Sequence, residues 1–228
     1  YQGDLEISSL YFNLDAYLNE NFRLAAGLRF EDGEQMVNTY DVFQIVDNNI
    51  EKVIDEDYTL PSFTLTYLPE FDENLQIRFG LSQTIARPTF RELSPTLFID
   101  VDTDRVISGS LYLENSEIDN IDLRVEYYWG FNQFLTAGLF FKDISKPIEE
   151  VVNESGDLII TSYQNVPSAE VTGFEIEYER IYEDLLPDSK WGSTKEFIFK
   201  MNFTATDSEV IYSDTDTYIN TQGREVNA

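Results

Sequence analysis

The chain has 228 residues, and its 15 Lys and Arg against 43 Asp and Glu give a formal net charge of −28 at neutral pH. This charge argues against DNA and RNA as partners, because their phosphates would repel the chain. The sequence contains neither His nor Cys, which excludes metal sites built on imidazole or thiolate and catalysis by Ser-His-Asp or Cys-His groups.

The first part of the chain alternates apolar and polar residues with a period of two, which indicates β-strands with one apolar face. The clearest example is the strand at 22–31, which places on its apolar face Phe22, Leu24, Ala26, Leu28 and Phe30. Its other face carries charge and glycine. The same pattern predicts strands at 10–18, 57–68 and 75–82.

The second part of the chain repeats the pattern after a long interruption. It predicts strands at 118–128 and 134–142. Two further strands are predicted from alternating apolar residues, which are Phe174, Ile176 and Tyr178 in one and Phe197, Phe199, Met201 and Phe203 in the other. The first of these two strands carries Glu175, Glu177 and Glu179 on its polar face.

Short and long connections alternate between these strands. The short ones are 19–21, 69–74 and 129–133, and the long ones are 32–56, 86–117 and 143–168. We expect 32–56 to form a long acidic loop, partly as strand extensions. A hairpin is predicted within 143–168, around Ser155, Gly156 and Asp157, because residues with high strand propensity flank that turn.

This rhythm favours a transmembrane β-barrel, in which short turns lie at one rim and long loops at the other. Aromatic residues flank the short turns, as expected at a membrane interface, namely Tyr17, Phe22, Tyr67, Phe71, Tyr127, Trp129, Phe131, Tyr182 and Trp191. No run approaches the ~18 apolar residues of a membrane helix. The alternative is one sheet of a soluble β-sandwich, which gives no reason for alternating connections.

The run at 82–93, which reads SQTIARPTFREL, resembles a signature of TonB-dependent outer-membrane receptors, in which a barrel strand ends in an Arg-Pro-aromatic-acidic-Leu run. Three later segments fit the same family pattern in order, at 119–128, 141–149 and 169–177. One segment departs from the pattern. Family members often carry an Asn-Pro-x-Leu-x-Pro-Glu run before the segment that corresponds to 119–128, whereas this chain reads GSLYLENS at 109–116.

The resemblance implies an all-β fold, an antiparallel transmembrane β-barrel of which this chain is a fragment of a 22-stranded whole. We expect residues 1–228 to be a partial barrel that lacks the plug domain and the terminal strands. The implied function is energy-coupled uptake, in the bacterial outer membrane, of a scarce solute such as a ferric siderophore, cobalamin or an oligosaccharide. The implied partners are the TonB energy-transducing protein, which would act through the absent plug, the small-molecule solute, and outer-membrane lipid. The alternatives are a passive porin-like channel and a soluble β-sandwich binding module.

Two groups of acidic residues could indicate other chemistry. Residues 100–104 begin like a calcium loop, but Arg105 stands where the turn needs Gly and Leu111 where a bidentate Glu belongs, so only a looser surface site remains open beside a solvated loop. The polar-face carboxylates, including Glu175, Glu177, Asp122 and Glu126, are expected to pair across strands with Arg23, Arg29, Arg78 or Lys200 rather than to act as acid–base catalysts.

The dipeptide Arg87-Pro88 is expected to end the ladder of its strand, because Pro lacks an N–H donor. A ligand contact by Arg87 or Arg91 is secondary to that role. The sequence therefore predicts no catalytic, cofactor-binding or metal-binding residue, no cofactor and no enzymatic activity, and it does not identify the ligand-binding residues.

Overall fold

A curved sheet of nine strands makes up most of the computed structural model, which describes residues 1–40, 49–100, 105–155, 158–189, 192–212 and 226–227. The sheet contains, in spatial order, β1 (Gln2–Tyr17), β2 (Phe22–Tyr40), β3 (Asn49–Tyr67), β4 (Leu75–Ala86), β7 (Ser116–Gly130), β8 (Gln133–Ser145), β11 (Ser168–Ser189), β12 (Gly192–Ile211) and β13 (Val226–Asn227). The strands from β1 to β12 pair antiparallel, and β13 pairs parallel with β12.

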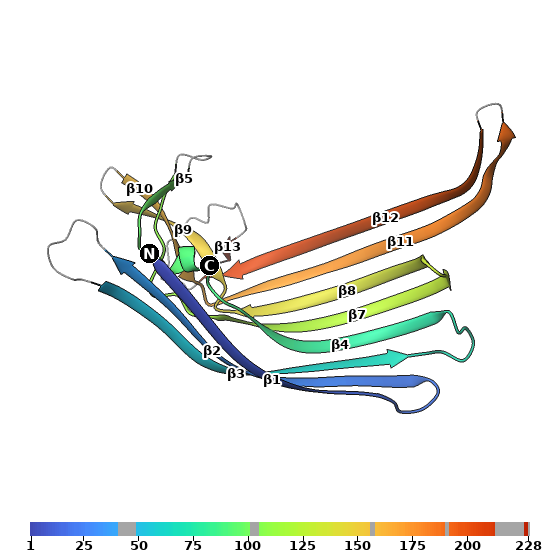
Figure 1. Cartoon of the computed structure of the whole chain (residues 1–228), viewed down its shortest axis with the longest axis horizontal. Coiled ribbons are helices and arrows are strands. Elements are labelled where there is room, and N and C mark those ends of the chain that lie inside the picture. Colours follow the sequence, from blue (N-terminus) through green and yellow to red (C-terminus); the bar gives the residue numbers. More distant parts are fainter. Residues whose placement is uncertain (41–48, 101–104, 156–157, 190–191, 213–225, 228) are drawn as a thin grey trace.

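A second, smaller sheet lies at one end of the large one (Figure 1). It has the order β5-β6-β10-β9 and contains β5 (Phe98–Asp100), β6 (Arg105–Ile107), β10 (Leu158–Asn165) and β9 (Ile148–Ser155). The short helix α1 (Phe90–Leu93) lies beside it. Within the described ranges no helix is long and apolar enough to cross a membrane.

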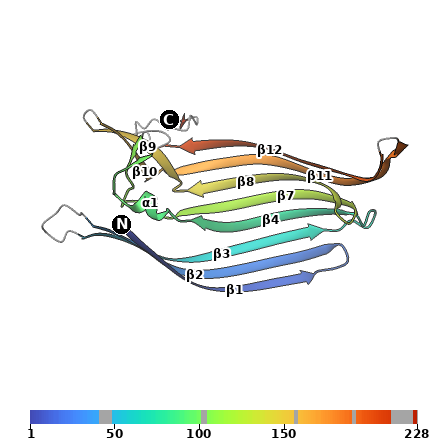
Figure 2. The ribbon, with the colours of Figure 1, turned by 45° about the horizontal axis from the view of Figure 1, so that its top comes forward.

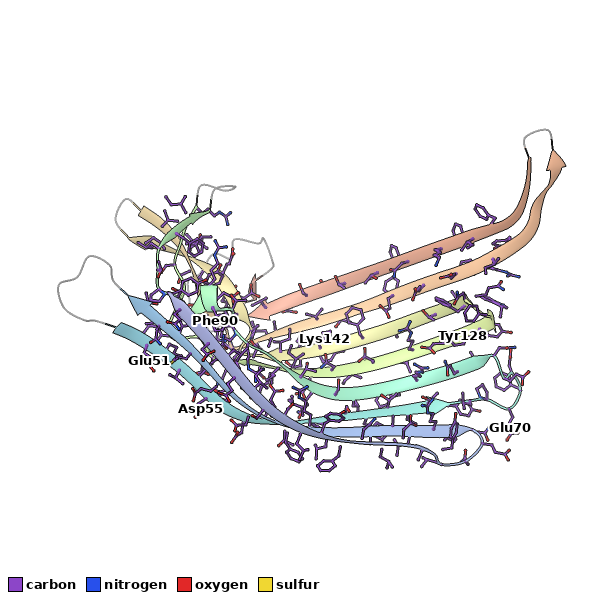
Figure 3. All side chains as sticks on the ribbon, in the orientation of Figure 1. Glu51, Asp55, Glu70, Phe90, Tyr128 and Lys142 are labelled. Atoms are coloured by element: carbon purple, nitrogen blue, oxygen red, sulfur yellow. The ribbon has the colours of Figure 1, made fainter. Side chains whose placement is uncertain are left out.

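The two ends of the large sheet differ as the sequence predicts. Short turns join β1 to β2, β3 to β4 and β7 to β8 at one end, whereas α1 and the small sheet are inserted at the other (Figure 2). Figure 3 places Glu70 and Tyr128 at the short-turn end and Glu51 and Asp55 at the long-connection end. The described strands form an open arc between β1 and β13, so the total of 22 strands stays a prediction.

The strand register aligns the apolar residues of neighbouring strands into continuous rows. One row crosses the sheet through Ala16, Leu24, Leu65, Phe79, Leu123, Leu139, Phe174 and Ala205. We call the residues from Phe22 to Phe30 that share this face on β2, with those aligned to them on other strands, the apolar band. The face that carries the apolar band is the outer face, and the opposite, polar face is the inner face.

Residues of the apolar band are exposed or half-buried, and none of them is packed between two sheets. Leu139 is 60% exposed and Phe203 is 52% exposed, and the buried hydrophobic residues of the described part of the chain all lie outside the band. A soluble β-sandwich would bury this face against a second sheet. The structure therefore confirms an all-β, antiparallel arc with an apolar outer face, and the described strands do not form a β-sandwich around that face.

Several strands are much longer than the sequence pattern predicts. The expected loop at 32–56 is largely strand, since β2 continues to Tyr40 and β3 begins at Asn49. Alternation of apolar and polar residues marks a strand only in the stretch where one face must be apolar. Beyond that stretch both faces of the strand contact water or other segments, so the sequence shows no alternation there. The predicted hairpin in 143–168 is confirmed as β9 and β10, with its tip at 156–157 outside the described residues.

Aromatic rings cluster along the short-turn rim, as predicted for a membrane interface. Phe22 and Tyr67 lie 5.0 Å apart between ring centroids, and Trp129 lies 5.3 Å from Tyr127 and 5.7 Å from Tyr178. The turn between β7 and β8 is closed by Asn132 at φ 53°, a left-handed conformation that Asn tolerates better than most residues. Trp191, which the sequence also assigned to this rim, lies outside the described residues.

Candidate functional site

The inner face at the long-connection end is covered by residues 87–100 and 105–115, which we call the mouth segment. It leaves β4 at Ala86 and immediately forms an ion pair, in which Arg87 Nη2 lies 2.5 Å from Glu31 Oε1. The Glu31 side chain is only 4% exposed, and it also pairs with Arg29 at 2.5 Å. Further along β2, on the same face as Glu31, Gln35 Nε2 donates to the carbonyl of Pro88 at 2.7 Å.

Two glycines on the inner face make room for this segment. A Cβ atom at Gly33 would lie 2.7 Å from Arg87 Nη2, and a Cβ atom at Gly3 would lie 2.5 Å from the ring of Phe90. Both distances are far below a normal van der Waals contact between heavy atoms. The glycines of β1 and β2 therefore allow the mouth segment, which includes the labelled Phe90, to lie directly against the inner face of these two strands (Figure 3).

The mouth segment has its own small apolar core. Leu93 and Leu113 are fully buried against Val37 of β2 and Ile54 of β3, with Phe90 packed beside them. Helix α1 begins with a capping box, in which Glu92 N donates to Thr89 Oγ1 at 3.3 Å and Thr89 N donates to Glu92 Oε2 at 2.7 Å. The apolar contacts fix the segment to the strand extensions of β2 and β3, and the capping box stabilises α1.

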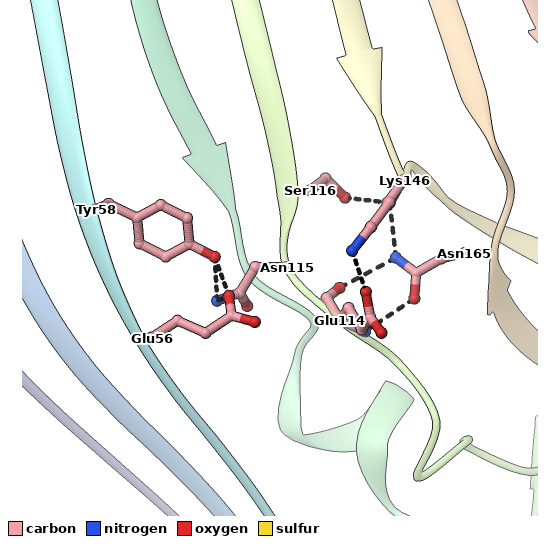
Figure 4. Close-up of polar contacts among 7 residues, drawn as sticks. All are labelled: Glu56, Tyr58, Glu114, Asn115, Ser116, Lys146 and Asn165. Carbon is pink, nitrogen blue, oxygen red and sulfur yellow. Dashed lines mark hydrogen bonds and ion pairs between the residues drawn. The ribbon is translucent and has the colours of Figure 1, made fainter.

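The end of the mouth segment is tied to two further elements (Figure 4). On one side, Asn115 Nδ2 donates to Glu56 Oε2 and to the Tyr58 hydroxyl, both at 3.0 Å. On the other side, Asn165 Nδ2 donates to the carbonyls of Glu114 at 3.1 Å and Lys146 at 2.6 Å. The segment thus bridges β3 to the β8–β9 turn.

At this junction the backbone of Lys146 has a left-handed conformation, with φ 54°. Its carbonyl accepts hydrogen bonds from Ser116 Oγ at 2.8 Å and from Asn165 Nδ2, and its ammonium group pairs with the Glu114 carboxylate. That pairing lowers the pKa of Glu114 and raises the pKa of Lys146. Nearby, burial and the hydrogen bond to Glu56 raise the pKa of Tyr58 to about 12.

Acidification should weaken the Glu114–Lys146 contact. The pKa of Glu114 is below its ordinary value of 4.5, so the contact stabilises the fold above that value and is lost as the pH falls through the lowered pKa. The raised pKa of Lys146 means that its contribution is complete below 10.5 and lost at still higher pH. Both side chains are at least half exposed, so we expect the contact to contribute only about 0.2–1 kcal/mol to the free energy of unfolding.

Hydrogen exchange of the Glu114 amide measures this effect, because that amide donates to Asn165 Oδ1 at 2.8 Å. After correction for intrinsic exchange, its protection should fall on acidification below the ordinary carboxyl range. The same measurement on Glu114→Gln should show no such fall. Equal pH dependence in both proteins would contradict the assignment.

A second polar cluster lies deeper on the inner face, level with the apolar band. Glu126 is 3% exposed and lies 3.1 Å from Arg124 Nε and 3.4 Å from Arg78 Nη2. Arg124 reaches across β8 to Glu175 and Glu177 of β11, both at 3.7 Å. We call these five residues the inner-face network.

Glycine also makes the inner-face network possible. Gly138 lies between Arg124 and Glu175 in the strand register, and a Cβ atom there would lie 3.1 Å from Glu175 Cγ. The predicted pairing of carboxylates with basic residues is confirmed for Lys200, which lies 2.9 Å from Glu179, and for Arg78. The sequence missed Arg124 as the partner of Glu175 and Glu177, because that contact skips a strand.

The sequence also singled out Arg87, Arg91 and a calcium-like loop at 100–104. Arg87 does end β4, but its main contact is the ion pair with Glu31, which sequence reasoning missed. Arg91 stacks over the ring of Phe98, with its Cζ 3.7 Å from the ring centroid. The calcium-like loop lies mostly outside the described residues, since 101–104 are not described. Among residues that are described, no group of three or more acidic side chains is placed to hold a metal ion.

Comparisons with solved structures relate this arc to parts of larger barrels. The siderophore receptor PiuA from Acinetobacter baumannii matches with a TM-score of 0.62 at 15% identity, over 96% of this chain and 28% of that one. The FrpB iron transporter from Neisseria meningitidis (F3-3 variant) matches with a TM-score of 0.60 at 12% identity, over 96% and 28%. A double mutant of the Serratia marcescens hemophore receptor HasR, in complex with its hemophore HasA and heme, matches with 0.58 at 12%, over 78% and 33%.

These identities establish a shared fold, and the chain spans a third or less of each of these three proteins. No curated protein matches the chain. The model of the family described as TonB dependent receptor-like, beta-barrel, matches residues 1–228. Barrels of this family lie in the outer membrane of Gram-negative bacteria. The chain therefore belongs to the TonB-dependent receptor family, as part of its β-barrel.

Proposed function

We propose that the protein containing this chain is an outer-membrane receptor that takes up a scarce solute with energy delivered by TonB. The family match over all 228 residues carries this proposal. The arrangement of the mouth segment supports it, because a structured wall at the long-connection end offers a fixed surface against which a solute can be selected. We expect the TonB contact to lie outside this part of the barrel.

The solute class proposed is that of chelated metals, cobalamin or oligosaccharides. The solved relatives support the first of these by their names, which mention siderophores, iron and heme. The inner-face network sets two arginines against three glutamates, so its charges are largely paired and do not by themselves identify the solute.

Uptake measured in the native host tests the proposal. Deleting the gene should abolish high-affinity accumulation of one labelled solute under limitation for it, and the full-length gene should restore it. Removing TonB or collapsing the proton-motive force should abolish uptake in the complemented strain as well. Uptake that survives both treatments would identify the passive porin-like channel instead.

A further inference from the structure

Strands β3 and β4 separate partway along their length. The last pair that joins them is Ser62 with Ser82. Continued in the same register, the pairing would set Ala86, the last residue of β4, opposite Tyr58. Residues 51–57 of β3 therefore extend past the end of β4, and we call this stretch the free edge. Figures 1 and 2 show the ends of β2 and β3 leaving the sheet together, apart from β4.

The free edge is a regular strand with one unpaired side. Its other side pairs with β2, in a ladder that runs without a bulge from Tyr67 to Asn49 of β3. Among the described residues, no strand other than β2 pairs with 51–57, and no other backbone-to-backbone hydrogen bond reaches this stretch. A regular strand edge of this kind presents N–H and C=O groups that can hydrogen-bond to a further strand.

The outer face beside the free edge is acidic. Its exposed carboxylates are Glu51, Asp55 and Asp57, of which Figure 3 labels the first two. Asp57 is paired with Asp32 of β2. Asp55 is paired with Glu34 of the same strand. Like charges directly opposite one another on neighbouring strands repel, so a basic side chain placed beside them is favoured.

We propose that the free edge binds an extended polypeptide with basic residues at alternate positions, as an added antiparallel strand. Backbone hydrogen bonds supply affinity in this mode of binding, and alternate side chains supply specificity. The basic side chains would share the outer face with Glu51, Asp55 and Asp57, since every second residue of a strand lies on the same face. The site would thus take a polypeptide ligand in addition to the small solute proposed above.

The same carboxylates explain which strands the free edge would reject. An unprotected edge pairs with edges of other molecules, and charged side chains are one of the means by which proteins prevent this. A second copy of this chain would bring its own acidic residues to the contact, because the net charge is −28. Repulsion between like charges therefore disfavours self-pairing and leaves a basic polypeptide as the favoured partner.

Binding of a model peptide to the full-length receptor tests the proposal. The peptide has the length of the free edge, alternates Lys with Thr, and carries blocked ends and a fluorescent label. The receptor is held in nanodiscs of phosphatidylcholine, which has no net charge and so does not attract the peptide. We expect saturable binding by fluorescence anisotropy, together with slower hydrogen exchange in residues 51–57.

Two further peptides test the strand geometry. One is methylated on the backbone nitrogen of every Lys, and the other on that of every Thr. Successive N–H groups of a strand point to opposite sides, so only one of the two peptides loses the hydrogen bonds to the free edge. That peptide should bind at least about tenfold more weakly, and the other should bind as the unmethylated peptide does.

Receptor variants test the charge assignment. Asp55→Asn combined with Asp57→Asn removes two exposed carboxylates from the free edge. Asp4→Asn combined with Glu6→Gln is the matched control, because it removes two exposed carboxylates from the same face of β1, two strands away. Binding should weaken about tenfold in the first variant and less than about twofold in the second. All four side chains are exposed, so both variants should fold.

Equal weakening in the two variants would overturn the proposal, since it would show that the peptide adsorbs to the acidic surface as a whole. Equal binding of the two methylated peptides, or binding without slower exchange in 51–57, would overturn the added strand. Failure of the unmethylated peptide to bind would overturn the proposal as well, and so would receptor dimers that form through the free edge without peptide.

Discussion

Replacing Leu24 by Arg should destabilise the folded barrel by about 2–4 kcal/mol, the cost of a basic side chain on the lipid face near the bilayer midplane. Leu24 belongs to the apolar band, where its partners are Ala16 on β1 and Leu65 on β3. In the folded protein an arginine at this position has no acidic residue beside it on the same face. Its guanidinium group would have to reach the interface or draw water into the hydrocarbon.

The neighbouring residue provides a matched control. Arg23 lies on the inner face, where it pairs with Asp15 at 2.5 Å, and both side chains are more than 40% exposed. Replacing Arg23 by Leu should therefore cost far less than replacing Leu24 by Arg, because solvent screens an exposed ion pair. Equilibrium unfolding of the full-length receptor in lipid vesicles measures both. Equal costs for the two substitutions would contradict the assignment of the outer and inner faces.

This contrast depends on a part of the fold that the sequence predicts well. Period-two alternation follows directly from strand geometry, and a lipid-facing strand must keep one face apolar throughout. The alternation in 22–31, 57–68 and 75–82 puts Leu24, Leu65 and Phe79 each on the apolar face of its strand, and the structure aligns them in one row. Local pattern suffices here because the partner of the apolar face is lipid.

The mouth segment could not be predicted in the same way. Its contacts join residues far apart in the chain, such as Arg87 to Glu31 across 56 residues and Asn115 to Glu56 across 59. Neither partner of such a pair carries a local signal, since a Glu in an acidic stretch reads as a solvated residue. The glycines at 3 and 33 are equally uninformative in the sequence, because their role depends on what lies against them.

The resemblance at 82–93 acquires a physical meaning from these contacts. Each conspicuous residue of its Arg-Pro-aromatic-acidic-Leu run has a separate structural contact: Arg87 binds Glu31, the Pro88 carbonyl accepts from Gln35, and Phe90 covers Gly3. Glu92 completes the capping box, and Leu93 enters the apolar core of the segment. The run therefore anchors the mouth segment to the inner face of β1 and β2.

Glu31→Leu should release this anchor. The substitution leaves the Arg87 side chain, which is 16% exposed, without its carboxylate partner, and breaking a buried ion pair in this way costs about 3–5 kcal/mol. The loss should appear as faster hydrogen exchange in the mouth segment, with the apolar band unchanged. Glu34→Leu is the control, because Glu34 lies on the same strand but on the exposed outer face. Its replacement should change the free energy of exchange in the mouth segment by no more than about 0.5 kcal/mol.

The double variant Glu31→Leu with Arg87→Met separates two ways in which the anchor could work. If the cost of Glu31→Leu arises from an uncompensated buried charge, removal of the second charge should restore much of the protection in the mouth segment. If protection stays low in the double variant, the ion pair itself positions the segment. If protection is already high in Glu31→Leu alone, the ion pair is dispensable, and the apolar contacts of Leu93 and Leu113 with Val37 and Ile54 are the anchor.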